Sequence, residues 1–166
     1  MANKHRHRHG QMQLREYGIA SATVVERTDM LWIDTTDNEV KPASDFPWGG
    51  GTLSLAQTDF ANLFVGIAYE ESASGDTDDI GVDVSADSVY EFDVTSATYN
   101  SGDVLGPSDN ASANTAFDDQ SLEGCSTTAR AVARAFETKA SAVTLLRVTF
   151  ASVHNPSANN VNAVVG

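Results

Sequence analysis

Residues 89–107 read VYEFDVTSATYNSGDVLGP and form the clearest β pattern in the chain. Within VYEFDV the two acidic residues alternate with Tyr, Phe and Val, and successive side chains of a strand point to opposite faces. The alternation predicts that Tyr90 and Phe92 point into a core. We expect residues 95–103 to form a loop with an Asn-Ser-Gly turn, and VLGP to begin another strand that ends at Pro107.

An internal echo adds two further β units. The sequence VGIAYEESAS at residues 65–74 and the sequence VARAFETKAS at residues 132–141 share Val, Ala, an aromatic residue, Glu, Ala and Ser in one register. The second copy alone has the spacing of an amphipathic helix, but the first contains Gly66 and runs into SGDTDD, which is typical of a hairpin turn. Since alternating stretches follow both copies, at Ile80–Val84 and Val143–Phe150, we interpret both as strand–turn–strand units.

The rest of the chain adds short strand patterns separated by turn residues. Small and β-branched residues predict a strand at Tyr17–Val25, and an apolar run predicts another at Met30–Ile33, before an Asp-Asn turn. The prolines and glycines of residues 41–51 predict irregular structure, and the polar residues 108–127 predict a long exposed loop. This pattern indicates an all-β fold, a small β-barrel or sandwich, with no helix longer than two turns.

The expected organisation is one β domain between two terminal segments. Residues 1–16 form an extended basic N-terminal arm, which we expect to be disordered alone; residues 17–153 form the β domain, and residues 154–166 a C-terminal tail. The single cysteine, Cys125, excludes an internal disulfide framework and a cysteine-based zinc site. Because there is no apolar run of about 20 residues and no signal-peptide core, we expect a soluble, non-secreted protein.

The charge is large and unevenly placed. The net charge is −13, but the first fifteen residues contain four bases, Lys4, Arg6, Arg8 and Arg15, and no acid. The remaining residues therefore hold six bases against 23 acids, or −17. So acidic a body repels phosphates and anionic lipid, and we expect neither a nucleic-acid nor a membrane partner. The Asp-rich, Lys-poor composition resembles that of proteins from hypersaline organisms, with an ordinary acidic domain as the alternative.

Three features suggest ligand binding, and each has a plainer alternative. In HRHRH, alternating His5, His7 and His9 would face one side of a strand, but the arginines between them repel a cation, which favours a flexible arm. The acidic segment 76–87 could gather oxygens around Ca²⁺, yet it lacks the glycine and glutamate of an EF-hand, which favours a solvated hairpin. Trp48 could be a ligand platform or could pack over the edge of the core. We expect no cofactor and no metal.

The chain lacks the signatures of common enzyme classes. It contains no GxSxG elbow, no P-loop, no HExxH and no GxGxxG after a strand. Cys125 has no paired histidine context, because His154 is the only histidine outside the N-terminal arm. We therefore expect no catalytic residues, and a small β-barrel enzyme is the least favoured alternative.

Three stretches together resemble the small decoration, or cement, proteins of tailed-virus capsids. They are FVGIAYEESASGDTDDIGVDV, SVYEFDVTSATYNSGDVLGP and ARAVARAFETKASAVTLLRVTF, which span roughly Leu63 to Phe150, about half of the chain. The family pattern is a "GIA…sasGd…I.V…G.fEF" hairpin, an "SATY..GD.vGP" turn and a later "a.aigra.e" strand. The pattern contains no catalytic motif, and residues 1–60 lie outside it.

The resemblance implies a structural β-barrel protein on the exterior of a virion, commonly a homotrimer at three-fold positions. Its partner would be the major capsid protein, and its function would be to stabilise an icosahedral shell. We expect the bases of the N-terminal arm, Lys4, Arg6, Arg8 and Arg15, to contact the capsid. The alternative is a glycan- or host-surface-binding β-module of a virion fibre or spike, using Trp48, the 108–127 loop and a Ca²⁺ ion at the acidic hairpin.

Overall fold

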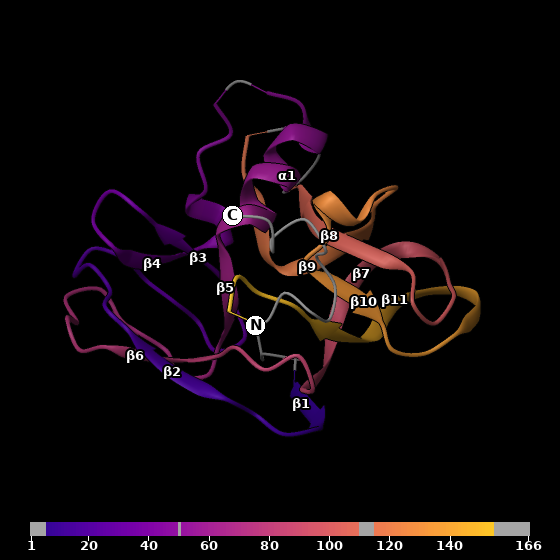
Figure 1. The fold of residues 1–166 in the computed structure, drawn as a ribbon, viewed down its shortest axis with the longest axis horizontal. Helices are drawn as coiled ribbons and strands as arrows, with labels where there is room; N and C mark the ends of the chain where they lie inside the picture. Colours follow the sequence, from indigo (N-terminus) through magenta and orange to yellow (C-terminus); the bar gives the residue numbers. More distant parts are fainter. Residues whose placement is uncertain (1–5, 50, 110–114, 155–166) are drawn as a thin grey trace.

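The computed structural model describes residues 6–49, 51–109 and 115–154, which form eleven strands, one α-helix and two short 3-10 helices (Figure 1). In chain order the elements are β1 (Arg6–His9), β2 (Leu14–Tyr17), β3 (Met30–Asp34), β4 (Glu39–Pro42), η1 (Ala43–Asp45), α1 (Leu53–Leu63), β5 (Phe64–Ala68), β6 (Ile80–Asp83), β7 (Val89–Tyr99), β8 (Val104–Asp109), β9 (Phe117–Gly124), η2 (Thr128–Arg130), β10 (Ala133–Ala135) and β11 (Lys139–Phe150). The described part of the chain is therefore all-β in class, as predicted.

Five of the strands close into a small barrel. The order β7-β11-β10-β8-β9 is completed by a parallel pairing of β9 with β7, in which Asp93 lies opposite Ser121 and Val94 opposite Leu122. Strand β11 runs along one side of β7, so β9 and β1 share the other side, with β1 opposite residues 89–91. Because the barrel closes, its first and last strands pair with each other and leave no unpaired edge between them, which stabilises a small β structure. The barrel confirms the predicted fold.

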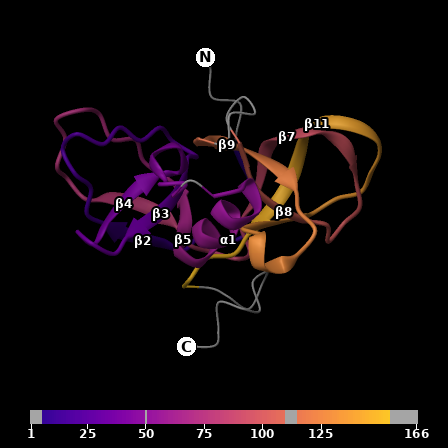
Figure 2. The same ribbon diagram turned by 90° about the horizontal axis from the view of Figure 1, so that it is seen from above.

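The other five strands form an open antiparallel sheet in the order β2-β6-β5-β3-β4. Figure 2 shows this sheet beside the barrel, with α1 between them. Both faces of its middle strands are covered: Met30 and Trp32 belong to the core shared with the barrel, whereas Leu31 belongs to a second core on the opposite face. A strand that is buried on both faces has a continuous run of apolar residues in its sequence, and β3 has such a run in MLWI.

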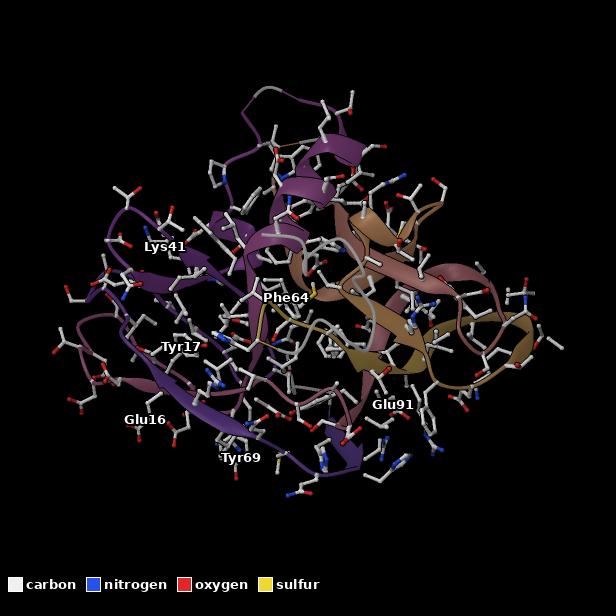
Figure 3. All side chains as sticks on the ribbon, in the orientation of Figure 1. Glu16, Tyr17, Lys41, Phe64, Tyr69 and Glu91 are labelled. Atoms are coloured by element: carbon white, nitrogen blue, oxygen red, sulfur yellow. The ribbon has the colours of Figure 1, made fainter. Side chains whose placement is uncertain are left out.

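Aromatic packing joins the helix, the sheet and the barrel. Phe60 of α1 is fully buried and its ring lies 5.3 Å from those of Phe46 and Phe117, the latter in β9. Phe64, at the centre of Figure 3, packs on Phe60 and on Phe150 of β11 at 5.9 Å in each case. These contacts make the two sheets one packed unit rather than two separate layers.

Two predictions about the strands are confirmed. Both copies of the echo form antiparallel hairpins, β5 with β6 and β10 with β11. In β7, Tyr90 and Phe92 are buried, with 4% and 0% of their surfaces exposed. The aromatic residue of each echo, Tyr69 or Phe136, follows the first strand of its hairpin and is exposed in both copies.

Several predicted loops are wrong because they form parts of the barrel. Strand β7 continues to Tyr99, and only residues 100–103 form the turn. Strand β8 does not end at Pro107: β10 pairs with β8 only at residues 104–105, so the missing N–H of the proline interrupts no pairing on that side. Most of the predicted 108–127 loop that the structure describes is β9, whose Phe117 and Leu122 fill the core.

Two further predictions are wrong at the level of single elements. Helix α1 has 11 residues, about three turns, because Ala56, Phe60 and Ala61 form a buried stripe against the core. The predicted strand Tyr17–Val25 is β2 at its first residue only; the later residues form turns that cover the second core, apart from a single bridge from Val25 to Ser72.

The prediction of a disordered arm at residues 1–16 is also wrong where the structure describes it. Strand β1 pairs with β7, and β2 pairs with β6. Between them Gly10 has φ +98°, and a Cβ at this position would lie 1.8 Å from the carbonyl oxygen of Asp87. Only glycine permits so close an approach, and it lets the chain dock on both sheets. Lys4 and residues 155–166 of the predicted tail lie outside the described residues.

Candidate binding surface along the N-terminal strands

The predicted capsid-contact residues do not form one cluster. Arg6 and Arg8 lie on β1, at the barrel, and Arg15 lies on β2, at the edge of the open sheet; all three are exposed, and Lys4 lies outside the described residues. Arg8 forms an ion pair with Glu91 of β7. Arg15 Nη1 lies 3.3 Å from Nδ1 of His154. Arg6 and Arg15 therefore present their charges from two different sheets.

Both N-terminal strands are sheet edges within the described residues. Each pairs with a single neighbour, so one row of backbone groups on each faces outward. Such a row is able to pair with a strand of another chain. Leu14 of β2 adds an apolar contact point, with 48% of its surface exposed. Arginine, an exposed Leu and free strand edges together are typical of a protein-binding surface.

A cleft of about 720 Å³ opens between the barrel and the open sheet. It is lined by β1, by the loop before β3 and by the segment after β5, and its lining residues are Arg6, His7, Met12, Glu26, Arg27, Thr28, Ala68, Tyr69, Glu71 and Tyr90. Figure 3 shows Tyr69 at the lower edge of the molecule, the edge on which β1 lies in Figure 1. Of the three predicted contact residues that the structure describes, Arg6 belongs to this cleft, and Arg8 and Arg15 do not.

The floor of the cleft is held by a chain of contacts between the two sheets. The His7 ring lies edge-on to Tyr90, with centroids 5.6 Å apart and an angle of 74°. The Tyr90 hydroxyl donates to Oδ2 of buried Asp83 at 2.7 Å, and the backbone N–H groups of Gln13 and Ser85 donate to Oδ1 at 3.0 Å. Burial and the Asp83 charge raise the pKa of Tyr90, so its hydroxyl stays a donor.

One wall of the cleft contains a strained residue. Thr28 has φ +77°, a conformation that is unfavourable for a β-branched side chain and costs about 1–3 kcal/mol. Two backbone hydrogen bonds enforce it, from Thr28 N–H to the Ala68 carbonyl at 2.8 Å and from Ala68 N–H to the Asp29 carbonyl at 2.9 Å. Strain of this kind is concentrated at functional sites, which makes this wall a candidate site.

Behind this wall lies a buried carboxyl group. Asp29 is 4% exposed and accepts hydrogen bonds from the Glu26 backbone N–H and from Gln120 Nε2, each at 2.7 Å. Burial is the largest cause that raises the pKa of Asp29, to about 7, and it outweighs the hydrogen bond from Gln120, which lowers the pKa; the nearby charge of Asp119 makes a smaller upward contribution. The loop before β3 therefore rests on a group that titrates near neutral pH.

The metal interpretations receive no support within the described residues. No group of three or more His, Cys, Asp or Glu side chains among them is placed to hold an ion. In the acidic hairpin, Asp76 accepts the backbone N–H of Asp78, whereas Asp83 turns inward to Tyr90. In the HRHRH segment His9 packs on Phe136 with centroids 4.9 Å apart, and His5 lies outside the described part.

The other singled-out residues serve packing. Trp48 is 8% exposed and packs on Phe117, with ring centroids 4.9 Å apart, which agrees with the core-edge interpretation. Burial raises the pKa of the Cys125 thiol, which disfavours the reactive thiolate. Sequence reasoning missed the cleft residues Tyr69, Thr28 and Arg27, because the cleft forms only when β1 docks between segments distant in sequence. The repeated aromatic of the echo was the one signal available for Tyr69.

A scan of protein-family models and a search of curated proteins both found no match to this chain. Among the described residues no helix is long and apolar enough to cross a membrane.

Proposed function

We propose that this chain is a capsid decoration protein, a structural virion component that binds the outer surface of an icosahedral shell and stabilises it. The observation that carries the proposal is the resemblance of Leu63–Phe150 to that family, since its three stretches correspond to β5–β6, β7–β8 and β10–β11. Four of the five barrel strands thus come from the resembling stretches. The proposed role is one of binding rather than catalysis.

The physical basis of the proposed function is linkage. A protein that binds only the mature lattice stabilises that lattice by mass action. Once its concentration exceeds the dissociation constant, the stabilising free energy grows with the logarithm of the ratio of the two. This role requires an interface and a rigid scaffold rather than a reactive group. A closed barrel joined to a sheet by an aromatic core is suited to it.

The surface that we propose for the major capsid protein is the edge formed by β1 and β2. Arg6 and Arg15 supply exposed positive charge in a body that is otherwise strongly acidic, and Leu14 supplies an apolar contact. Lys4 and Arg8 complete the set expected from the sequence, although Arg8 already pairs with Glu91. We further propose a homotrimer at three-fold positions on the capsid exterior, which is the arrangement implied by the resemblance.

Co-sedimentation with purified shells that lack the protein tests the proposal. We expect saturable, stoichiometric binding, and we expect the double variant Arg6→Gln, Arg15→Gln to weaken it by about tenfold or more. Arg134→Gln is the matched control, because Arg134 is bonded internally to the Gly102 carbonyl at 2.9 Å. Equal binding by both variants would contradict the proposed surface, and no binding by the wild type would contradict the proposed function.

A glycan- or host-surface-binding module remains the second candidate function. Two features that suggested it have other roles, since Trp48 is buried and residues 117–124 form a barrel strand. The cleft beside β1 is the feature that favours it. Binding to host envelope preparations in place of shells would select this candidate.

A further inference from the structure

The cleft beside β1 contains two arginines in a protein that has few bases. The chain carries 23 acids and ten bases, yet two guanidinium groups, those of Arg6 and Arg27, and the imidazole of His7 line this one cleft. Guanidinium groups bind planar oxyanions through paired, charge-assisted hydrogen bonds. The chemistry of these side chains is therefore suited to a carboxylate.

His7 offers a buried nitrogen at the floor of the cleft. Its Nε2 is shielded from solvent and has no hydrogen-bond partner among the described residues. Buried polar atoms are nearly always paired, so one without a partner in a cleft wall indicates a place for a ligand group. The edge-on contact with Tyr90, itself bonded to Asp83, fixes the ring and thereby the position of this nitrogen.

The cleft also offers a flat ring and hydrogen-bond acceptors. Tyr69 is 40% exposed although its backbone is fixed, with its N–H donating to the Gly81 carbonyl at 2.9 Å. An exposed phenol ring presents an apolar face together with a polar hydroxyl. The carboxylates of Glu26 and Glu71 accept hydrogen bonds from hydroxyl groups. A ligand that fits these groups has one apolar face and several hydroxyls.

We propose that the cleft binds an acidic sugar, with its carboxylate held by Arg6 and His7 and its ring packed on Tyr69. A sugar acid combines the three properties that the lining selects: an oxyanion, hydroxyl donors and a ring with an apolar face. The cleft of about 720 Å³ lies within the usual range for small-ligand sites and has room for one or two sugar rings. Arg6 belongs to both proposed sites, but sugar binding is measured on the protein without shells and shell binding without the sugar, so either proposal can fail without the other.

The test is a titration of the full-length protein, followed by amide NMR shifts, with three probes. Sodium glucuronate carries a carboxylate on a sugar ring, glucose carries the ring alone, and inorganic phosphate carries an oxyanion alone. We expect glucuronate to shift the amides of residues 6–9, 26–29 and 69–71, and to bind about tenfold more tightly than either control. Equal binding of glucose, binding of phosphate alone, or no shift with glucuronate would overturn the proposal.

Single variants locate the site. We expect Arg6→Gln and Tyr69→Ala each to weaken glucuronate binding by about tenfold. Arg8→Gln is the matched control, because Arg8 lies on the same strand but pairs with Glu91 and does not line the cleft. We expect Arg8→Gln to change the affinity less than about twofold. An equal loss in Arg6→Gln and Arg8→Gln would mean non-specific attraction and would also overturn the proposal.

Discussion

The buried carboxyl of Asp29 makes a specific prediction about stability and pH. Its pKa is about 7 in the folded protein, whereas an unfolded aspartate has a pKa of 3.8. Because the folded pKa is the higher one, folding is favoured by protonation, and this contribution is present at low pH and is lost as the pH rises through 7. Between pH 5 and pH 8 the free energy of unfolding should fall by about 3 kcal/mol from this group alone.

The assay is urea unfolding at several pH values for the wild type, Asp29→Asn and Asp118→Asn. Asp29→Asn has no titrating group, so we expect it to lack the fall of about 3 kcal/mol. Its absolute stability at pH 5 should be lower, because both oxygens of Asp29 accept N–H donors and one position becomes an amide nitrogen. Asp118→Asn changes an exposed carboxylate in the same region and should follow the wild type. Parallel pH profiles for wild type and Asp29→Asn would refute the reasoning.

Three further predictions concern the sheet junction, the N-terminal strands and the charge. Tyr90→Phe leaves Asp83 without its hydroxyl donor, so we expect a loss of about 1–3 kcal/mol in urea unfolding; an unchanged midpoint would contradict the contact. Gly10→Val should release β1, seen as faster amide exchange at residues 6–9, because its Cβ would meet the Asp87 carbonyl. Gly75→Val, at φ +96° in open space, is the control for backbone strain and should leave that exchange unchanged. The melting temperature should rise from dilute buffer to 1 M NaCl, where the Debye length is ~3 Å, and a flat or falling series would mean that the acids are neutralised locally.

The parts of the fold that could be predicted are those with local patterns. The alternation in VYEFDV placed Tyr90 and Phe92 in the core, and the echo placed two hairpins. Helix α1 also had a local signal that the prediction did not use, since Ala56, Phe60 and Ala61 recur at helical spacing. Propensity alone does not separate these choices, because burial against the barrel is what stabilises the helix.

The parts that could not be predicted depend on contacts between distant residues. The sequence of β9 has the polar pattern of a loop. It forms a strand because it pairs with both β7 and β8 and so closes the barrel. The sequence of β1, RHRH, contains no apolar residue, and only His7 of its four residues is partly buried in the structure. It therefore has the pattern of a flexible arm. For the same reason, Arg6 is the one cleft residue among the predicted bases that the structure describes, because the other walls of the cleft come from sequence positions near 27 and 69.

The most direct test of the central claim is a reconstruction of the source virion at a resolution that resolves single subunits. Capsid decoration predicts density for the barrel and the open sheet on the exterior of the shell, in groups of three at three-fold positions. It further predicts that the β1–β2 edge faces the major capsid protein. Density at a fibre or spike, with none on the shell surface, would contradict the account.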